Sequence, residues 1–287
     1  MNNSSRKFTN KKLIITVISV ILSIALYIFG YLYFIYLPEG EAEVHFIDVG
    51  QGDAALVLSN QGTVLIDTGT MDSGEKVAAY VSLYTDTIDY MILSHPHEDH
   101  IGGAPYVFKE LSVENVIMPD FSADSTCFDK LLDSIEKEKC NLYPAESGDV
   151  YSVGDIRIEI LAPVTGVEYE DANNVSTVAK IVFGQTSFLF TGDIESSSEN
   201  ELIMSDAYLK SDVLKAPHHG SSTSSSHAFL EAVSPDYAVI SCEKGNTYGH
   251  PHRETLAKYK DYGISVLRTD KSGTVIFNTD GLNVTVQ

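Results

Sequence analysis

The chain is poor in positive charge. It has 19 Lys and Arg against 40 Asp and Glu among 287 residues, a formal net charge of −21. Four of the cations precede every acidic residue: Arg6, Lys7, Lys11 and Lys12. Residues 13–287 therefore carry −25. Because tight contact with a polyanion needs clustered Lys and Arg, this excludes an extended nucleic-acid-binding face, and any nucleic acid would have to be held locally, through metal.

Cysteine is also scarce. The three cysteines, Cys127, Cys140 and Cys242, have no metal-binding spacing. Cys127 and Cys140 flank an expected helix and could pair in an oxidising compartment, although the odd count gives no complete disulfide framework. Cys242 lies in an apolar strand, and we expect it in the core.

One long run lacks charge altogether. Residues 13–37 contain no charged side chain and are long enough to span a bilayer. With cations before this run and acidic residues after it, the positive-inside rule predicts a cytoplasmic N-terminus. A cleaved signal peptide is the alternative, but Pro38-Glu39-Gly40 offers no small-x-small cleavage site. We expect a basic cytoplasmic segment, an uncleaved single-pass anchor in the cell membrane, a short linker and an extracytoplasmic domain at residues 1–12, 13–37, 38–42 and 43–287.

A dense cluster of polar residues follows the apolar run Tyr90-Met91-Ile92-Leu93, and reads His95-Pro96-His97-Glu98-Asp99-His100. Three imidazoles and two carboxylates at the end of a buried strand indicate a divalent metal site. Pro96 keeps His95 extended, so His95 and His97 lie on one side of the chain and can share one ion. Asp99 and His100 come after the strand end, in the turn towards a Gly-Gly loop, and would face a second ion.

Strand and helix patterns alternate through residues 43–287. Expected strands are 43–49, 54–58, 63–66, 88–93, 113–118, 150–153, 156–161, 178–183, 187–190, 212–216, 237–241, 264–267 and 274–277. Expected helices are 74–84, 105–111, 125–139, 195–205, 227–233 and 254–262. Two halves that each begin with hairpins and continue with strand-helix alternation predict two sheets face to face with helices outside, a four-layer αββα sandwich of the α/β class.

Further metal-binding residue types stand at other expected strand ends, which should converge on one rim. The Asp193 carboxylate can bridge two ions. One of His218 and His219 should bind metal, while the other orients it or faces substrate. His250 could be a ligand, a general acid or a phosphate contact. Asp67 suits a carboxylate that receives the N–H of a ligand imidazole.

Five separated motifs resemble the metallo-β-lactamase superfamily, and more narrowly the ComEC-like extracytoplasmic hydrolase domain of DNA-uptake proteins, whose relatives include phosphorylcholine esterases. The motifs are His45–Ala54, Ser94–Gly103, Phe190–Asp193, Leu214–Ser221 and Tyr248–Pro251. The resemblance covers essentially residues 43–287. It implies the same αββα fold, preceded here by the expected transmembrane helix, and two divalent metal ions.

By this resemblance, His95 and His97 hold one metal, Asp99 and His100 hold the other, Asp193 bridges them, and His218 or His219 completes the second site. The third histidine that the superfamily usually supplies to the first site is absent. Asn174 is the nearest candidate, and ComEC-like domains tend to have asparagine there. An oxygen-richer first site makes Mn²⁺ an alternative to Zn²⁺ and predicts an exchangeable metal beside His95 and His97. Residues expected to support the ligands without binding metal themselves are Asp48, Asp53, Asp67 and, if it does not complete the first site, Asn174.

The implied activity is phosphodiester hydrolysis by a metal-activated water, most directly on DNA. Besides Asp99, the residues expected to act on substrate are Ser221, Lys244 and His250. The acidity of the chain favours a smaller diester, such as a phosphocholine or wall-polymer substituent, as an alternative. β-Lactam hydrolysis is disfavoured by the incomplete first site. A membrane-anchored sensing module that binds metal without turnover is the alternative from another class, and no protein partner can be inferred.

Overall fold

The computed structural model describes residues 16–24, 27 and 40–287. It divides the chain into two units, residues 1–38 and residues 39–287. Residues 16–24 are helical. Within the described residues, no helix is both long enough and apolar enough to cross a membrane. The anchor expected over residues 13–37 falls mostly outside the described residues and stays a prediction.

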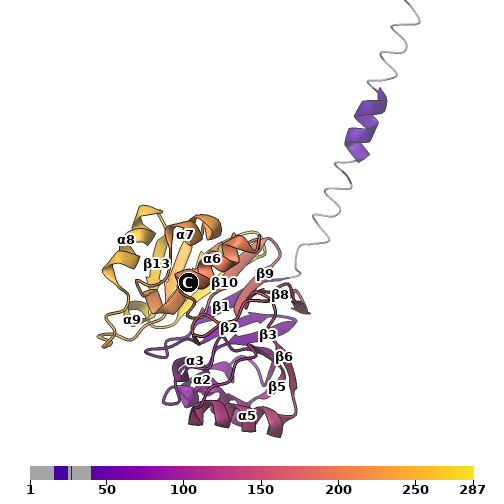
Figure 1. The fold of residues 1–287 in the computed structure, drawn as a ribbon. Helices are drawn as coiled ribbons and strands as arrows, with labels where there is room; N and C mark the ends of the chain where they lie inside the picture. The colour runs from indigo at the N-terminus through magenta and orange to yellow at the C-terminus, as the bar shows by residue number, and fades with distance from the viewer. Residues whose placement is uncertain (1–15, 25–26, 28–39) are drawn as a thin grey trace, which may run out of the picture. The chain divides into compact units, whose positions relative to one another are not determined.

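Two β-sheets form the centre of the larger unit (Figure 1). The strands of the first are β1 Ala42–Phe46, β2 Ala55–Ser59, β3 Gly62–Ile66, β4 Thr87–Ile92, β5 Ser112–Met118, β6 Asn141–Pro144, β14 Val275–Thr279 and β15 Val284–Val286. The strands of the second are β7 Val150–Val153, β8 Ile156–Ala162, β9 Val178–Phe183, β10 Thr186–Phe190, β11 Val213–Lys215, β12 Tyr237–Ile240 and β13 Ser265–Arg268. Their orders are β15-β14-β1-β2-β3-β4-β5-β6 and β13-β12-β11-β10-β9-β8-β7.

Helices cover the outer face of each sheet (Figure 1). Those of the first half are α2 Gly74–Val81, α3 Glu98–Ile101, α4 Ala104–Glu110 and α5 Thr126–Glu138. Those of the second half are α6 Ser196–Met204, the 3₁₀ helix η1 Pro217–Gly220, α7 His227–Val233, α8 Arg253–Asp261 and α9 Thr269–Ser272. Phe46 and Phe190 stack between the sheets with centroids 5.5 Å apart. Separate cores lie under the two helical layers, around Phe128 and Phe229. The layers are the expected αββα arrangement.

The division between the sheets does not follow the two halves of the sequence. β14 pairs antiparallel with β1, with Val275 opposite Phe46, so the C-terminal strands join the first sheet. The edge strands β6 and β15 were not expected, because most of their side chains are exposed and they show no buried alternation. The four-residue helix α3 takes the place of the turn expected at Asp99 and His100.

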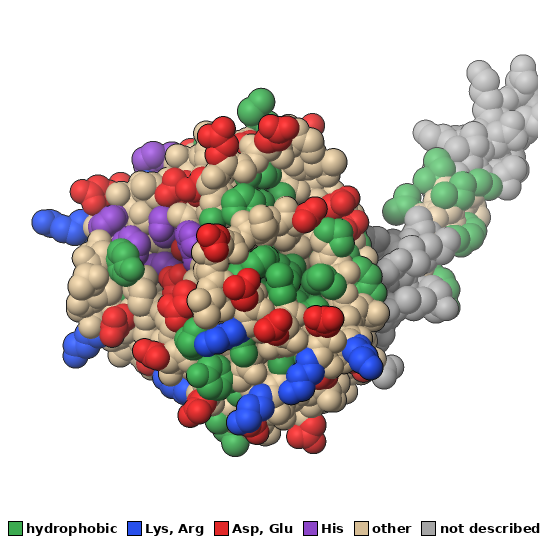
Figure 2. Space-filling model, turned by 60° about the horizontal axis from the view of Figure 1, so that its bottom comes forward, with side chains coloured by type: hydrophobic (Ala, Val, Ile, Leu, Met, Phe, Trp, Pro, Cys, Tyr) green, Lys and Arg blue, Asp and Glu red, His purple; other side chains and the backbone are tan. Residues whose placement is uncertain are grey.

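The strand directions bring polar residues to one rim. Strands β3, β4 and β5 are parallel to one another, as are β10, β11, β12 and β13. Asp67 follows β3 directly and Asp193 is the third residue after β10, while Ser94 to His100 follow β4 and His219 follows β11. The carboxyl ends of parallel strands are where α/β folds bind ligands. Figure 2 shows histidine side chains gathered in one area of the surface, with acidic side chains around them.

Candidate active site

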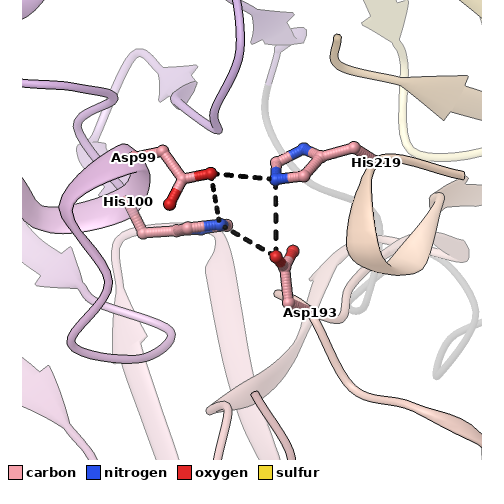
Figure 3. Close-up of side chains that lie close together, drawn as sticks. All are labelled: Asp99, His100, Asp193 and His219. Atoms are coloured by element: carbon pink, nitrogen blue, oxygen red, sulfur yellow. Dashed lines mark ion pairs between the residues drawn. The ribbon is translucent and has the colours of Figure 1, made fainter. Parts of the chain in front are cut away.

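Four side chains from both halves of the fold converge in what we call the ligand cluster: Asp99 and His100 of α3, Asp193 after β10, and His219 of η1 (Figure 3). Their ligand atoms all lie within 4.8 Å of one another. Asp193 Oδ2 is 3.4 Å from His100 Nε2 and 3.4 Å from His219 Nε2. Asp99 Oδ2 is 3.3 Å from His219 Nε2 and 3.9 Å from His100 Nε2. Two imidazole nitrogens and two carboxylate oxygens form a donor set that divalent zinc accepts.

Buried atoms of the ligand cluster lack hydrogen-bond partners. His100 Nε2, His219 Nε2 and Asp193 Oδ1 are all buried without a hydrogen bond to any described residue. Buried polar atoms are nearly always satisfied, because desolvating them without a partner costs free energy. A divalent cation would satisfy the two imidazole nitrogens together with Asp193 Oδ2, and Oδ1 would remain for a second ion. The residues present therefore fit a metal site.

The electrostatics of the ligand cluster also suit a cation. Burial lowers the pKa of His100, but Asp193, followed by Asp67, raises it well above the ordinary imidazole value. The pKa of His219 shifts in the same direction: burial lowers it, but Asp193 and then Asp53 raise it well above the ordinary imidazole value. Burial raises the pKa of Asp193, but His219 and then His100 lower it well below the usual carboxyl value. The buried carboxylates thus favour positive charge on the groups around them, which also suits a divalent cation at this position.

Both cluster histidines are oriented through their other ring nitrogen. His100 Nδ1 lies 2.8 Å from Asp67 Oδ2, and the backbone N–H of Ser94 donates to Asp67 Oδ1 at 2.7 Å. His219 Nδ1 lies 3.0 Å from the carbonyl oxygen of Ser241. A partner on Nδ1 fixes the ring and leaves Nε2 directed at the cluster, the usual arrangement behind a metal-bound histidine.

A buried ion pair lies behind the ligand cluster. Lys215 Nζ is 2.6 Å from Asp53 Oδ2, and Asp53 Oδ1 is 3.3 Å from His219 Nδ1. Burial raises the pKa of Asp53, but Lys215 and then His219 lower it to about 2. Asp53 is placed by Gly52, whose φ is +134° and whose position leaves no room for a Cβ beside the carbonyl oxygen of Asp99. The backbone N–H of Asp53 donates to that same oxygen at 3.1 Å.

The side chains of His95 and His97 face each other, but fewer potential metal ligands lie around them than in the ligand cluster. His95 Nε2 is 3.0 Å from His97 Nδ1. Among the described residues, neither belongs to a group of three or more histidine, cysteine or carboxylate ligands. Burial, followed by His100, lowers the pKa of His95 well below its usual value, so the ring is uncharged and able to bind metal.

The ligand cluster opens into a cleft that Asp99, Asp193, His219 and His250 line, and Asn174 does not line it. Its Oδ1 accepts hydrogen bonds from the backbone N–H of Glu195 and from Ser197 Oγ, both at 3.0 Å, and so ties down the start of α6. The neighbouring Asn173 lines the cleft instead, and its Oδ1 is buried without a hydrogen bond to the described residues. Of the two neighbours it is thus Asn173 that lines the cleft, and the sequence did not point to it because nothing in an Asn-Asn pair within a loop distinguishes the two.

His219 is the member of the histidine pair that enters the ligand cluster. His218 Nδ1 lies 3.3 Å from Glu195 Oε1, and its Nε2 is 3.9 Å from Asp193 Oδ2. His250 lines the same cleft, with its ring centroid 5.6 Å from that of His218. Burial, followed by His219, lowers the pKa of His250 to about 4, so this ring is uncharged at neutral pH. Tyr248 stacks on His250 at 5.7 Å and remains exposed.

Comparison with known proteins agrees with this geometry. Residues 47–244 match the family described as the metallo-beta-lactamase superfamily. The chain belongs to this superfamily. The ComE operon protein 3 of Bacillus subtilis (strain 168) is 34% identical over 265 residues, 85% of this chain and 34% of that protein. The competence protein ComA of Neisseria gonorrhoeae is 32% identical over 247 residues, 84% of this chain and 33% of that protein.

This chain thus spans about a third of the length of these relatives.

Solved structures show the same fold. The metallo-beta-lactamase fold protein YhfI of Bacillus subtilis superposes with a TM-score of 0.55 at 14% identity, covering 84% of this chain and 100% of that chain. The metallo hydrolase Igni18 of Ignicoccus hospitalis gives a TM-score of 0.55 at 17% identity, covering 82% of this chain and 98% of that chain.

Three residues that were expected at the active site do not line the cleft. Ser221 was expected to contact substrate, but it is buried and does not line the cleft. Its hydroxyl lies 3.0 Å from that of Thr223 in its own loop. Lys244 and Asp48 line a neighbouring groove and not the ligand cluster. The three cysteines are free, and Cys127 does not pair with Cys140.

The metallo-β-lactamase fold and the His/Asp cluster together support a metal-dependent hydrolase with a divalent metal site.

Proposed function

We propose that the protein is a binuclear metal-dependent phosphodiesterase that acts on DNA. The observation that carries the proposal is the convergence of two carboxylates and two imidazoles from both halves of the fold, with buried ligand atoms that lack other partners. The similarity to a protein named as a competence protein supports DNA as the substrate. A pair of metal ions held there would lower the pKa of a water molecule and stabilise the oxyanions that develop during hydrolysis.

The protein's own residues divide the work. Asp99, His100 and His219 would hold the second metal, Asp193 would bridge, and His95 and His97 would hold the first. Asn173 Oδ1, which is buried without a hydrogen bond to the described residues and lines the cleft, would complete the first site. An amide oxygen in place of a third imidazole would make that site weaker and favour Mn²⁺ there, with Zn²⁺ the expected metal of the second. The uncharged ring of His250 faces the same cleft and is suited to contact the scissile phosphate or the leaving group.

The test is a substrate panel with the purified chain in Zn²⁺, in Mn²⁺ and in EDTA. The panel contains bis-p-nitrophenyl phosphate, single-stranded DNA, double-stranded DNA and phosphocholine esters. The proposal predicts hydrolysis of the simple diester and of DNA with metal, abolished by EDTA and restored by metal. Metal binding without hydrolysis of any substrate would contradict it and favour a sensing module.

A second candidate is a phosphodiesterase for phosphocholine or a wall-polymer substituent. Glu98 and Glu243 line the cleft in addition to the ligands, so its rim is acidic and favours a cationic leaving group over a polyanion. Hydrolysis of phosphocholine esters but not of DNA would select this candidate. We also propose that residues 13–37 anchor the enzyme with its domain outside the cytoplasm, which a topology reporter fused to the C-terminus would test.

A further inference from the structure

A second groove adjoins the cleft of the ligand cluster. It has a volume of about 770 Å³, and it shares Gln51, Thr70 and Glu243 with that cleft, so the two are continuous along this edge. Three lysines line it: Lys76 of α2, Lys244 after β12 and Lys271 of α9. They come from three separate elements that the fold brings together. We call this the lysine groove.

These lysines are free to meet a ligand. All three are exposed, and among the described residues none forms an ion pair. Lys76 Nζ donates to the backbone carbonyl of Asp48, which holds its ammonium group at the groove. The groove therefore gathers three ammonium groups without a carboxylate partner, in a chain that carries −25 over residues 13–287.

Four acidic groups line the groove, and one of them is paired with a cation: Asp270 accepts hydrogen bonds from Arg268 Nε at 2.8 Å and Arg268 Nη2 at 2.7 Å. Asp48, Asp72 and Glu243 remain opposite the three lysines, so the charges that line the groove are balanced. In a chain that carries −25 over residues 13–287, this balance makes the groove a place where ammonium groups can contact an anion.

We propose that the lysine groove binds a second phosphate of a single-stranded polynucleotide whose scissile phosphate lies at the ligand cluster. The inference rests on the proposed function, because it presumes phosphodiester hydrolysis. An ammonium group contacts a phosphate as a point charge, and each such contact adds affinity that falls with salt. A small diester would occupy the cleft alone, whereas a polymer would reach both places through their shared edge.

Tyr248 favours a polymer that carries bases. Its side chain is 66% exposed, it lines the cleft, and its ring stacks on His250 with an interplanar angle of 22°. Proteins that bind single strands without sequence preference combine a cationic track with exposed aromatic rings on which bases stack. A wall polymer without bases would gain nothing from this ring.

The test compares two pairs of charge reversals in the full chain. K244E/K271E changes the groove, and K137E/K260E makes the same charge change at exposed positions on α5 and α8. Substrates are bis-p-nitrophenyl phosphate, a single-stranded 12-mer and an abasic 12-mer. In K244E/K271E, the ratio of kcat/KM for the 12-mer to kcat/KM for the simple diester should fall about tenfold, because two exposed ammonium groups no longer pair with phosphate. The salt dependence for the 12-mer should become shallower by about 0.7 in log–log slope, because one phosphate is no longer neutralised.

The aromatic contact has its own pair of variants. Tyr248→Ala should raise KM for the 12-mer about tenfold, within the range expected for removing one base stack, but leave the abasic 12-mer at its wild-type KM. Tyr248→Phe keeps the ring and should bind both substrates as the wild type does. If Tyr248→Ala changes neither KM, and a poly(glycerol phosphate) competes as well as the 12-mer does, the polynucleotide assignment is overturned.

The other outcomes are distinguishable. If K137E/K260E lowers the substrate ratio as much as K244E/K271E does, or if neither lowers it, the lysine groove is not a phosphate subsite. If the wild type hydrolyses no diester with either metal, the proposed function itself fails, and the inference fails with it.

Discussion

The substitution Asp67→Asn tests how the fold prepares His100 for metal. Asp67 Oδ2 lies 2.8 Å from His100 Nδ1 and accepts Ser94 Oγ at 2.8 Å, while Oδ1 accepts the backbone N–H of Ser94 at 2.7 Å. Asparagine has the same shape, but its amide nitrogen donates, so at least one donor of this set must face another donor. Removing such a partner of a metal ligand typically costs 10- to 100-fold in metal affinity, about 1.4–2.8 kcal/mol.

The assay is isothermal titration of the chelated protein with Zn²⁺ and with Mn²⁺. Thermal unfolding in EDTA, measured alongside, separates a loss of folding stability from a loss of affinity. Asp89→Asn is the matched control, because Asp89 also accepts a backbone N–H, from Thr63 at 2.8 Å, but is not part of the ligand cluster. We expect the metal dissociation constant to rise at least tenfold for Asp67→Asn and less than twofold for Asp89→Asn. Equal effects would refute the role assigned to Asp67.

Three further predictions concern the backbone, a buried ion pair and pH. Gly52→Ala and Gly50→Ala both place a Cβ at positive φ, but only the first meets the carbonyl of Asp99, so only the first should abolish metal binding in titration calorimetry. Lys215→Met leaves Asp53 buried without its cation and should cost about 3–5 kcal/mol in urea unfolding; an unchanged urea midpoint would contradict this. In EDTA the melting temperature should fall as pH rises above about 6.5, because both imidazoles of the ligand cluster hold protons more tightly in the folded than in the unfolded chain. Saturating Zn²⁺ should remove that fall, and a melting temperature that rises over this range would count against it.

The regular elements of the fold could be predicted because local sequence specifies them. The β9–β10 hairpin has two apolar runs around Gly184, and α5 is preceded by the N-cap residue Ser125, whose side chain accepts the N–H of Phe128. The edge strands β6 and β15 could not be predicted from the sequence, because short exposed strands show no alternation of apolar and polar residues. The return of β14 to β1 joins residues far apart in the chain, and no local pattern encodes that pairing.

The chemical character of the site was predictable, since metal-binding residue types follow several strands at one rim. The choice between adjacent residues was not. His218 and His219 both adopt left-handed backbone conformations, with φ of 50° and 52°, in a short 3₁₀ segment that no periodicity describes. Asn173 and Asn174 lie in an irregular loop, and Ser221 lies in a run of serines in which burial depends on tertiary packing.

The central claim is that the ligand cluster holds the metal that drives diester hydrolysis. It is tested most directly by measuring bound metal and bis-p-nitrophenyl phosphate hydrolysis in Asp193→Ala beside the wild type, with Zn²⁺ and with Mn²⁺. Mutating a residue that only supports a metal ligand typically lowers metal affinity or activity 10- to 100-fold. Because Asp193 is itself a proposed ligand, we expect kcat/KM to fall at least a hundredfold in Asp193→Ala, together with loss of bound metal. Hydrolysis that survives undiminished in Asp193→Ala would contradict the two-metal assignment.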